Sequence, residues 1–252
     1  RGHIYCDLGL TAKSHKLRRF CTFTPPFLYV LLIHAVFRQG PGNCTISISR
    51  VVKKLCQDGQ LERAIRTATD MHNSKLNISI EILYFLVQEC IKTKDIHLGR
   101  RLHQLIITGG FIRDAFLGTH LIRMFNHCGS LWEAIQVFDG IRNPSVFTWN
   151  ALISAHTMHE EATEAIRLYS EMRCSNVCPD EHVFVAALKA CVKAEALSDG
   201  MLVHTDIVFS LFEPTSHVSN ILVDMYMKFH NVEDAQSVFE NVSTRDTITY
   251  TT

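Results

Sequence analysis

The chain has few of the features that would support catalytic, metal or membrane chemistry. None of its nine cysteines forms a Cys-x-x-Cys pair, and Cys174 and Cys178 lie four residues apart. An odd number of cysteines without such pairs argues against a disulfide framework and favours a reducing compartment. The longest apolar run, from Phe27 to Phe37, has eleven residues and includes His34. That run is too short for the roughly twenty apolar residues that cross a bilayer.

Acidic residues are almost absent from the N-terminal part. Residues 1–57 carry nine Lys/Arg and one acid, Asp7, whereas residues 58–252 carry sixteen Lys/Arg and twenty-four acids, so the net charge of zero conceals an asymmetry. Residues 1–44 are basic and rich in turn residues. We expect them to form a leader, either disordered or similar to an organellar transit peptide.

The alternating pattern of β-strands is also missing, and a long internal repeat is present instead. Residues 45–145 align without a gap on residues 146–246, with sixteen identical positions, and residues 247–252 begin a third copy. Such a match predicts an array of units that pack on their neighbours. Because the chain begins at Arg1 and ends six residues into that copy, we expect a fragment of a longer protein.

Each period contains three helical hairpins. In residues 162–172, apolar side chains recur at helical spacing, and a similar stripe precedes them from Trp149 to His156. Polar turns such as Asp58-Gly59 separate the paired helices. Matching cuts give units of 35, 35 and 31 residues in each period: 45–79, 80–114 and 115–145, then 146–180, 181–215 and 216–246.

These patterns resemble the pentatricopeptide repeat family, in its plant subclass with alternating P, L and S units. The segment from Phe147 to Ile153 with Pro179-Asp180 resembles a P unit, and Phe184 to Cys191 with Gly200 and His204 resembles an L unit. Asn220 to Tyr226, with the later Val238-Phe239, resembles an S unit. The resemblance covers residues 45–252 and implies a right-handed all-α solenoid that binds single-stranded RNA with one hairpin per nucleotide.

The resemblance also implies which side chains read the bases. A residue near the start of each first helix and the last residue of the hairpin would face a base edge, and an apolar neighbour would stack on the base. Asn with Asp implies a pyrimidine, and a short hydroxyl at the first of these two positions implies a purine. From 5′ to 3′, the units then predict purine, any base, purine, pyrimidine, any base, pyrimidine. The candidate base-reading residues are Asn150, Asp180, Asn220, Asp246, Thr119, Ser145, Ser49 and Ser79, and the candidate stacking residues are Phe147 and His217.

Simpler interpretations of the same residues exist. Asn150 and Asn220 could be N-caps, and Asp180 could be an acid of a first helical turn. We expect Trp149 to be buried. His103 and His204 share a unit position, but one histidine per unit gives no metal cluster, so a structural role is expected. A His-x-Glu match at residues 159–161 lacks the Cys-x-x-Cys of zinc deaminases and is treated as chance.

The sequence therefore predicts an all-α solenoid that binds single-stranded organellar RNA, in the mitochondrion or the chloroplast, without a cofactor, metal or membrane. By resemblance it would serve in C-to-U editing or RNA processing, with editing-complex proteins as further partners. No catalytic site is evident, so we expect recognition alone, and a deaminase-like extension would have to follow Thr252. The alternative is a protein-binding scaffold of the tetratricopeptide type, against which the 35-35-31 rhythm argues.

Overall fold

The computed structural model describes residues 41–210 and 215–241, with side chains from Ser49 onward. By packing, the chain divides into two units, Arg1–Val51 and Val52–Thr252. The expected leader, residues 1–44, lies outside the described residues apart from its last four, which open helix α3. Among the described residues, no helix is long and apolar enough to cross a membrane.

The described residues form twelve α-helices, one short 3-10 helix and no strand, which confirms the predicted all-α class. The helices alternate between a first and a second helix of each hairpin. The first helices are α3 (Pro41–Gln57), α5 (Ile80–Thr93), α7 (Ala115–His127), α9 (Val146–Met158), α11 (Glu181–Lys193) and α13 (Ser216–Lys228). The second helices are α4 (Leu61–Asn73), α6 (Ile96–Thr108), α8 (Leu131–Asp139), α10 (Ala162–Cys174), α12 (Leu197–Phe209) and α14 (Val232–Glu240), and η2 (Phe111–Arg113) precedes α7.

The turns inside the hairpins share one backbone conformation. Each has a residue with positive φ close to the start of the second helix, where a left-handed residue ends the first helix and reverses the chain. Glycine supplies this conformation at two of the turns and ordinary residues supply it elsewhere. The corresponding residues in the two copies are Gly59 and Glu160, Lys94 and Glu195, and Gly129 and His230, with φ between 54° and 79°.

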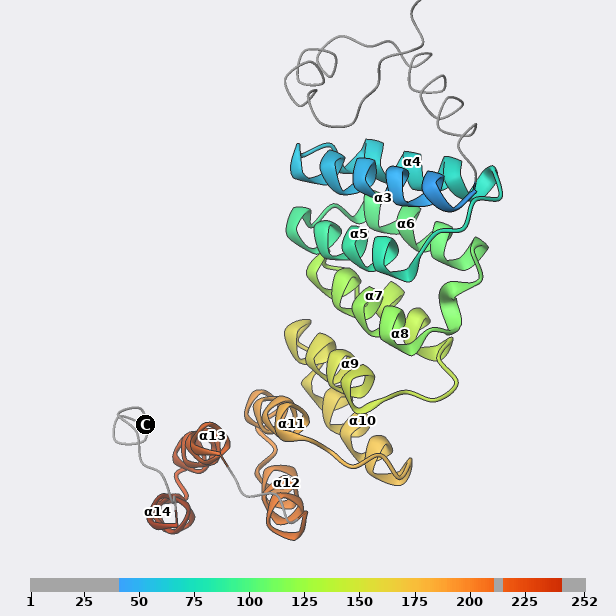
Figure 1. The fold of residues 1–252 in the computed structure, drawn as a ribbon. Coiled ribbons are helices and arrows are strands. Elements are labelled where there is room, and N and C mark those ends of the chain that lie inside the picture. The colour runs from blue at the N-terminus through green and yellow to red at the C-terminus, as the bar shows by residue number, and fades with distance from the viewer. Residues whose placement is uncertain (1–40, 211–214, 242–252) are drawn as a thin grey trace, which may run out of the picture. The chain divides into compact units, whose positions relative to one another are not determined.

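The first helices lie side by side and form one layer of the array. Helices α5, α7, α9, α11 and α13 each contact the next member of this series. From α6 to α14, each second helix packs against its own first helix, and from α4 to α12 each also packs against the first helix of the following hairpin. Figure 1 shows this alternation of paired helices from α4 to α14. A hairpin cannot cover its apolar faces alone, so stacking on its neighbours provides the core, as the solenoid architecture requires.

Several of the identical positions of the two copies lie in this core. Ala64 and Ala165 are fully buried, as are Cys90 and Cys191. Burial raises the pKa of both thiols to about 12, so they remain neutral and pack as small apolar groups. Trp149 is 3% exposed, as expected from the sequence.

A recurring contact joins each L unit to the S unit after it. Gly99 and His103 of α6 lie against Met124 and Phe125 of α7, and the His103 ring packs edge-on to Phe125 at 5.2 Å between centroids. In the second copy, Gly200 of α12 lies against Met225 of α13.

The histidine of the second copy makes a hydrogen bond at the same joint. The His204 Nδ1 lies 2.8 Å from the Tyr226 hydroxyl. Burial lowers the pKa of both His103 and His204. The described residues contain no group of His, Cys, Asp and Glu able to hold a metal ion. The contacts of His103 with Phe125 and of His204 with Tyr226 give both histidines a structural role at this joint.

Candidate nucleic-acid interface

Each described first helix from α5 to α13 begins at the first residue of a unit identified in the sequence. The last residue of the preceding unit is then the N-cap of that helix. Asp114 accepts a hydrogen bond from the Leu117 amide at 2.8 Å, and Asp180 accepts one from the Val183 amide at 3.0 Å. Four of these five closing residues, all except Ser79, therefore stabilise a helix through a side-chain cap.

The second residue of each unit from 80–114 onward projects from the array. Phe147 is 56% exposed, and Phe116, at the same place in the preceding unit, is 55% exposed. His217 is also exposed. Single exposed apolar side chains are common on protein surfaces, but these two aromatics occupy the same unit position on adjacent first helices. Phe116 was missed by the sequence analysis, although its unit position matches that of Phe147 and could have identified it.

We call the side of α5, α7, α9, α11 and α13 that carries the second, fifth and ninth unit residues the first-helix face. The second and ninth residues along it are exposed or half-buried. The second residues are Glu81, Phe116, Phe147, His182 and His217, and the ninth residues are Gln88, Arg123, Ser154, Lys189 and Asp224.

Asn150 and Asn220 lie at the fifth position, one turn into α9 and α13, and are not N-caps. Asn150 is half-buried, and its Oδ1 accepts only a weak contact from the Ser154 hydroxyl at 3.4 Å. Asn220 is 7% exposed, and its Oδ1 has no hydrogen-bond partner. A buried amide oxygen without a partner destabilises the free protein and would gain from a donor.

No hydrogen bond joins Asn150 to Asp180, the closing residue of its unit, within the described part of the chain. Asp180 uses one carboxylate oxygen as the cap of α11. Asp246 lies outside the described residues.

The fifth and last residues of unit 115–145 are engaged in the structure. Thr119 is 5% exposed, and its hydroxyl contacts the Ala115 carbonyl at 2.8 Å and the Thr148 hydroxyl at 2.8 Å. Ser145 forms a capping box with Thr148 at the start of α9. No sequence pattern indicates the link between Thr119 and Thr148, because the two residues belong to different units.

The first unit places its two candidates differently. Ser49 is half-buried in α3, and Ser79 is exposed at the N-cap of α5 without a side-chain capping bond.

Aromatic side chains gather between α5 and α7 on the first-helix face. The rings of Tyr84 and Phe116 lie 5.2 Å apart, and His120 meets each of them edge-on at 4.7 Å between centroids. Burial, with a smaller contribution from Arg123, lowers the pKa of His120, so the neutral ring is favoured. Tyr84 is the fifth residue of an L unit, and this packing gives it a structural role.

Charge is divided between the two layers of helices. The first helices α5, α7, α9, α11 and α13 contain five Lys/Arg and four Asp/Glu. The second helices α4, α6, α8, α10, α12 and α14 contain six Lys/Arg and eleven Asp/Glu. Among the helices, the acidic excess therefore lies on the second helices, and the first helices are close to neutral.

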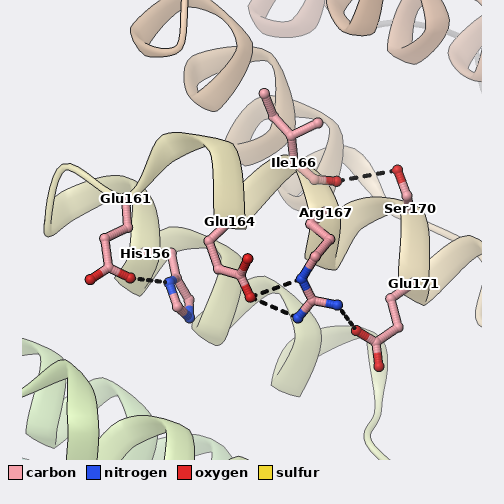
Figure 2. Close-up of polar contacts among 7 residues, drawn as sticks. All are labelled: His156, Glu161, Glu164, Ile166, Arg167, Ser170 and Glu171. Atoms are coloured by element: carbon pink, nitrogen blue, oxygen red, sulfur yellow. Dashed lines mark hydrogen bonds and ion pairs between the residues drawn. The ribbon is translucent and has the colours of Figure 1, made fainter.

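On the second helix α10, acidic side chains are held in ion pairs at the surface. Arg167 bridges two acids, with its Nη2 2.7 Å from Glu164 and its Nη1 2.9 Å from Glu171 (Figure 2). At the hairpin turn, the buried His156 Nδ1 lies 3.0 Å from Glu161 (Figure 2). Glu161, the last residue of the chance His-x-Glu match, thus closes a hairpin. Hydrogen bonds from Arg167 lower the pKa of Glu164, which keeps this surface ionised.

Stacked helical hairpins with one row of projecting side chains define an α-solenoid of repeat units. A model of the PPR repeat family matches residues 144–193. The chloroplast pentatricopeptide repeat-containing protein CRR2 of Arabidopsis thaliana is 30% identical over 230 residues, covering 90% of this chain and 34% of that protein. The chain belongs to the pentatricopeptide repeat family.

Other matched relatives in Arabidopsis thaliana carry mitochondrial names, so an organellar location, mitochondrion or chloroplast, is common to these relatives. The chain spans between 26% and 41% of the length of three similar curated relatives.

Solved structures share the fold. The maize pentatricopeptide repeat protein PPR10 superposes with a TM-score of 0.58 at 19% identity, covering 94% of this chain and 37% of that protein. PPR10 in complex with an 18-nucleotide psaJ RNA element gives a TM-score of 0.56 at 17% identity, covering 88% of this chain and 35% of that protein.

Proposed function

We propose that the first-helix face binds single-stranded RNA, with one unit for each nucleotide. The observation that carries the proposal is the row of second unit residues, in which Phe116 and Phe147 are each more than half exposed on adjacent first helices. Stacking on aromatic side chains holds bases of any sequence and contributes about 1–3 kcal/mol for each base. PPR10, which has the same fold, has been solved in complex with an 18-nucleotide psaJ RNA element, and this supports RNA as the partner.

Sequence selectivity would come mainly from the amides. The Asn150 amide can both donate and accept, and only a weak contact within its own helix occupies it. The free oxygen of Asp180 lies at the end of the same unit. This pair and the pair of Asn220 with Asp246 would select pyrimidines, with Ser49 and Ser79 facing a purine.

The charge distribution is compatible with RNA. Phosphates are repelled by acids, and the acidic excess lies on the second helices. Arg123 and Lys189 occupy the ninth position on either side of unit 146–180, and neither makes an ion pair within the described residues. They would lie beside the phosphates that flank the nucleotide at Asn150.

The alternating unit lengths suggest a role in organellar C-to-U editing or RNA processing, with editing-complex proteins as partners. The described array would supply recognition and not catalysis. A peptide-binding scaffold is the alternative.

The test measures the affinity of the purified chain for fluorescent RNAs that carry each base in turn opposite unit 146–180. A pyrimidine should bind at least about fivefold more tightly than a purine. Asn150→Ala should remove this preference, and Asn150→Ser should shift it toward purines. Asn73→Ala, an exposed amide on the second helix α4, is the matched control and should change nothing. Equal affinity for all four bases, or binding to peptides but not RNA, would overturn the proposal.

A further inference from the structure

The fifth and last residues of unit 115–145 belong to one chain of hydroxyl groups that crosses from α7 to α9. Thr119 contacts the Thr148 hydroxyl at 2.8 Å, and Thr148 contacts the Ser145 hydroxyl at 3.0 Å. This series of hydrogen-bonded hydroxyl groups ends at the Ala115 carbonyl oxygen, which lies 2.8 Å from the Thr119 hydroxyl. Both residues that would read a base in this unit therefore bind each other through Thr148.

The direction of these hydrogen bonds follows from the carbonyl end. A carbonyl only accepts, so the Thr119 hydroxyl donates to Ala115. Thr148 must then donate to Thr119, and Ser145 must donate to Thr148. The backbone amides complete the arrangement: the Ser145 amide donates to the Thr148 hydroxyl, and the Thr148 amide donates to the Ser145 hydroxyl, each at 3.3 Å. All three hydroxyl protons are in use.

Burial makes this arrangement costly to open. Thr148 is fully buried and Thr119 is 5% exposed. If Thr119 turned toward a base, its hydroxyl would leave both the Ala115 carbonyl and the Thr148 hydroxyl, and Thr148 would have to donate to Ser145 instead. Each hydrogen bond lost changes an equilibrium constant by about two- to 13-fold, so breaking both costs about five- to 150-fold. That range equals the discrimination that a good base contact provides, so the gain from reading a base would be cancelled.

The neighbouring unit differs in this respect. Asn150 is half-buried, and only a 3.4 Å contact within its own helix occupies its amide. In unit 115–145 the accessible group is Phe116, which is 55% exposed and offers a ring face to any base.

We infer that unit 115–145 tolerates every base: it holds its nucleotide by stacking on Phe116, and Thr119 and Ser145 stabilise the joint between α7 and α9. The inference rests on the proposed RNA binding. It replaces the purine expected from the resemblance at this place, so the target site should contain a degenerate position immediately 5′ of the pyrimidine at Asn150.

The experiment compares two sets of four RNAs with the wild-type chain. The first set varies the base opposite unit 146–180. This RNA position is identified as the one at which the Asn150→Ser variant changes the base preference. The second set varies the base immediately 5′ of it. Dissociation constants in the second set should agree within about twofold, whereas the first set should spread by at least about fivefold.

A purine preference above about fivefold in the second set, with the first set selective, would overturn this inference alone. Absence of RNA binding, or no spread in the first set, would overturn the proposed function and this inference with it.

Two variants separate stacking from edge reading. Phe116→Ala should weaken all four RNAs of the second set by the same factor, about five- to 150-fold. Trp132→Ala removes an aromatic that is 64% exposed on the second helix α8, and it should have no effect. Thr119→Val should leave the ratios within the second set unchanged. An altered ratio with Thr119→Val, or base-dependent losses with Phe116→Ala, would contradict the inference.

Discussion

The joint between L and S units makes a quantitative prediction about two glycines at the same unit position. A Cβ on Gly200 would lie 2.5 Å from the Met225 Sδ and 3.3 Å from its Cε. A Cβ on Gly99 would meet only the terminal Cε of Met124 closely, at 3.1 Å. Both methionines are fully buried. Gly200→Ala therefore forces a buried side chain to move, whereas Gly99→Ala needs a methyl shift of a few tenths of an ångström.

Two opposing effects decide the sign of each substitution. Replacing a glycine inside a helix by alanine stabilises the helix by roughly 0.5–1 kcal/mol. Inserting a methyl group into a packed core costs about 1–3 kcal/mol when the neighbours cannot adapt. At Gly200 the overlap should dominate, giving a net loss of about 1–2 kcal/mol. At Gly99 the helical gain should dominate, giving a change between zero and a gain of about 1 kcal/mol.

Urea unfolding followed by circular dichroism measures both variants, with hydrogen exchange in α12 and α13 to locate the change. The double variant Gly200→Ala/Met225→Ala tests the cause, because removing the long side chain should relieve the overlap and give a favourable coupling energy. If Gly200→Ala proved as stable as Gly99→Ala, or if the double variant showed no coupling, the reasoning from close packing would be refuted.

Two further predictions concern charge. Arg123→Gln and Lys189→Gln should each reduce the slope of log affinity for RNA against log salt by nearly one, whereas Arg66→Gln on the second helix α4 should leave it unchanged; equal slopes for all three variants would contradict a phosphate-binding role. Because burial lowers the pKa of His204, the folded chain resists its protonation, so the free energy of unfolding should fall as pH drops below about 6.5, and His204→Gln should flatten that profile in urea titrations from pH 8 to pH 5. A wild-type profile without this fall would show that burial of the histidine does not affect stability.

The internal repeat was sufficient to predict the helices, because periodicity and unit length can be read from the sequence alone. It was not sufficient to predict the side-chain contacts between neighbouring units. Gly99 and Met124 recur as Gly200 and Met225, but their identity alone did not reveal that they touch. In both copies the glycine and the methionine are 25 residues apart, but this spacing indicates a contact only when the way in which the two helices cross is known.

Burial at equivalent unit positions was harder to predict. Asn150 and Asn220 occupy the same position, yet the first is half-buried and the second is 7% exposed. Thr119 occupies that position as well and is held by Thr148, a residue of the next unit. A unit position determines the direction of a side chain, whereas the helix beside it determines whether the polar group is accessible. The position of a residue within its unit identified the candidates. Only the packing in the structure showed which of their polar groups are accessible and which already make hydrogen bonds.

The closing position of each unit combines two tasks that compete for the same atoms. Its residue caps the next first helix, which occupies one acceptor. A carboxylate has a second oxygen, so Asp114 and Asp180 can cap a helix and still present an acceptor outward. A hydroxyl has a single proton and no second oxygen. Ser145 donates that proton to Thr148, and Thr215 donates its own to Glu181 at 2.7 Å while capping α13. On the proposed RNA binding, aspartate at this position can cap a helix and still contact a base, whereas a serine or threonine whose proton is engaged, as at Ser145, would leave a unit that stacks on a base without reading it.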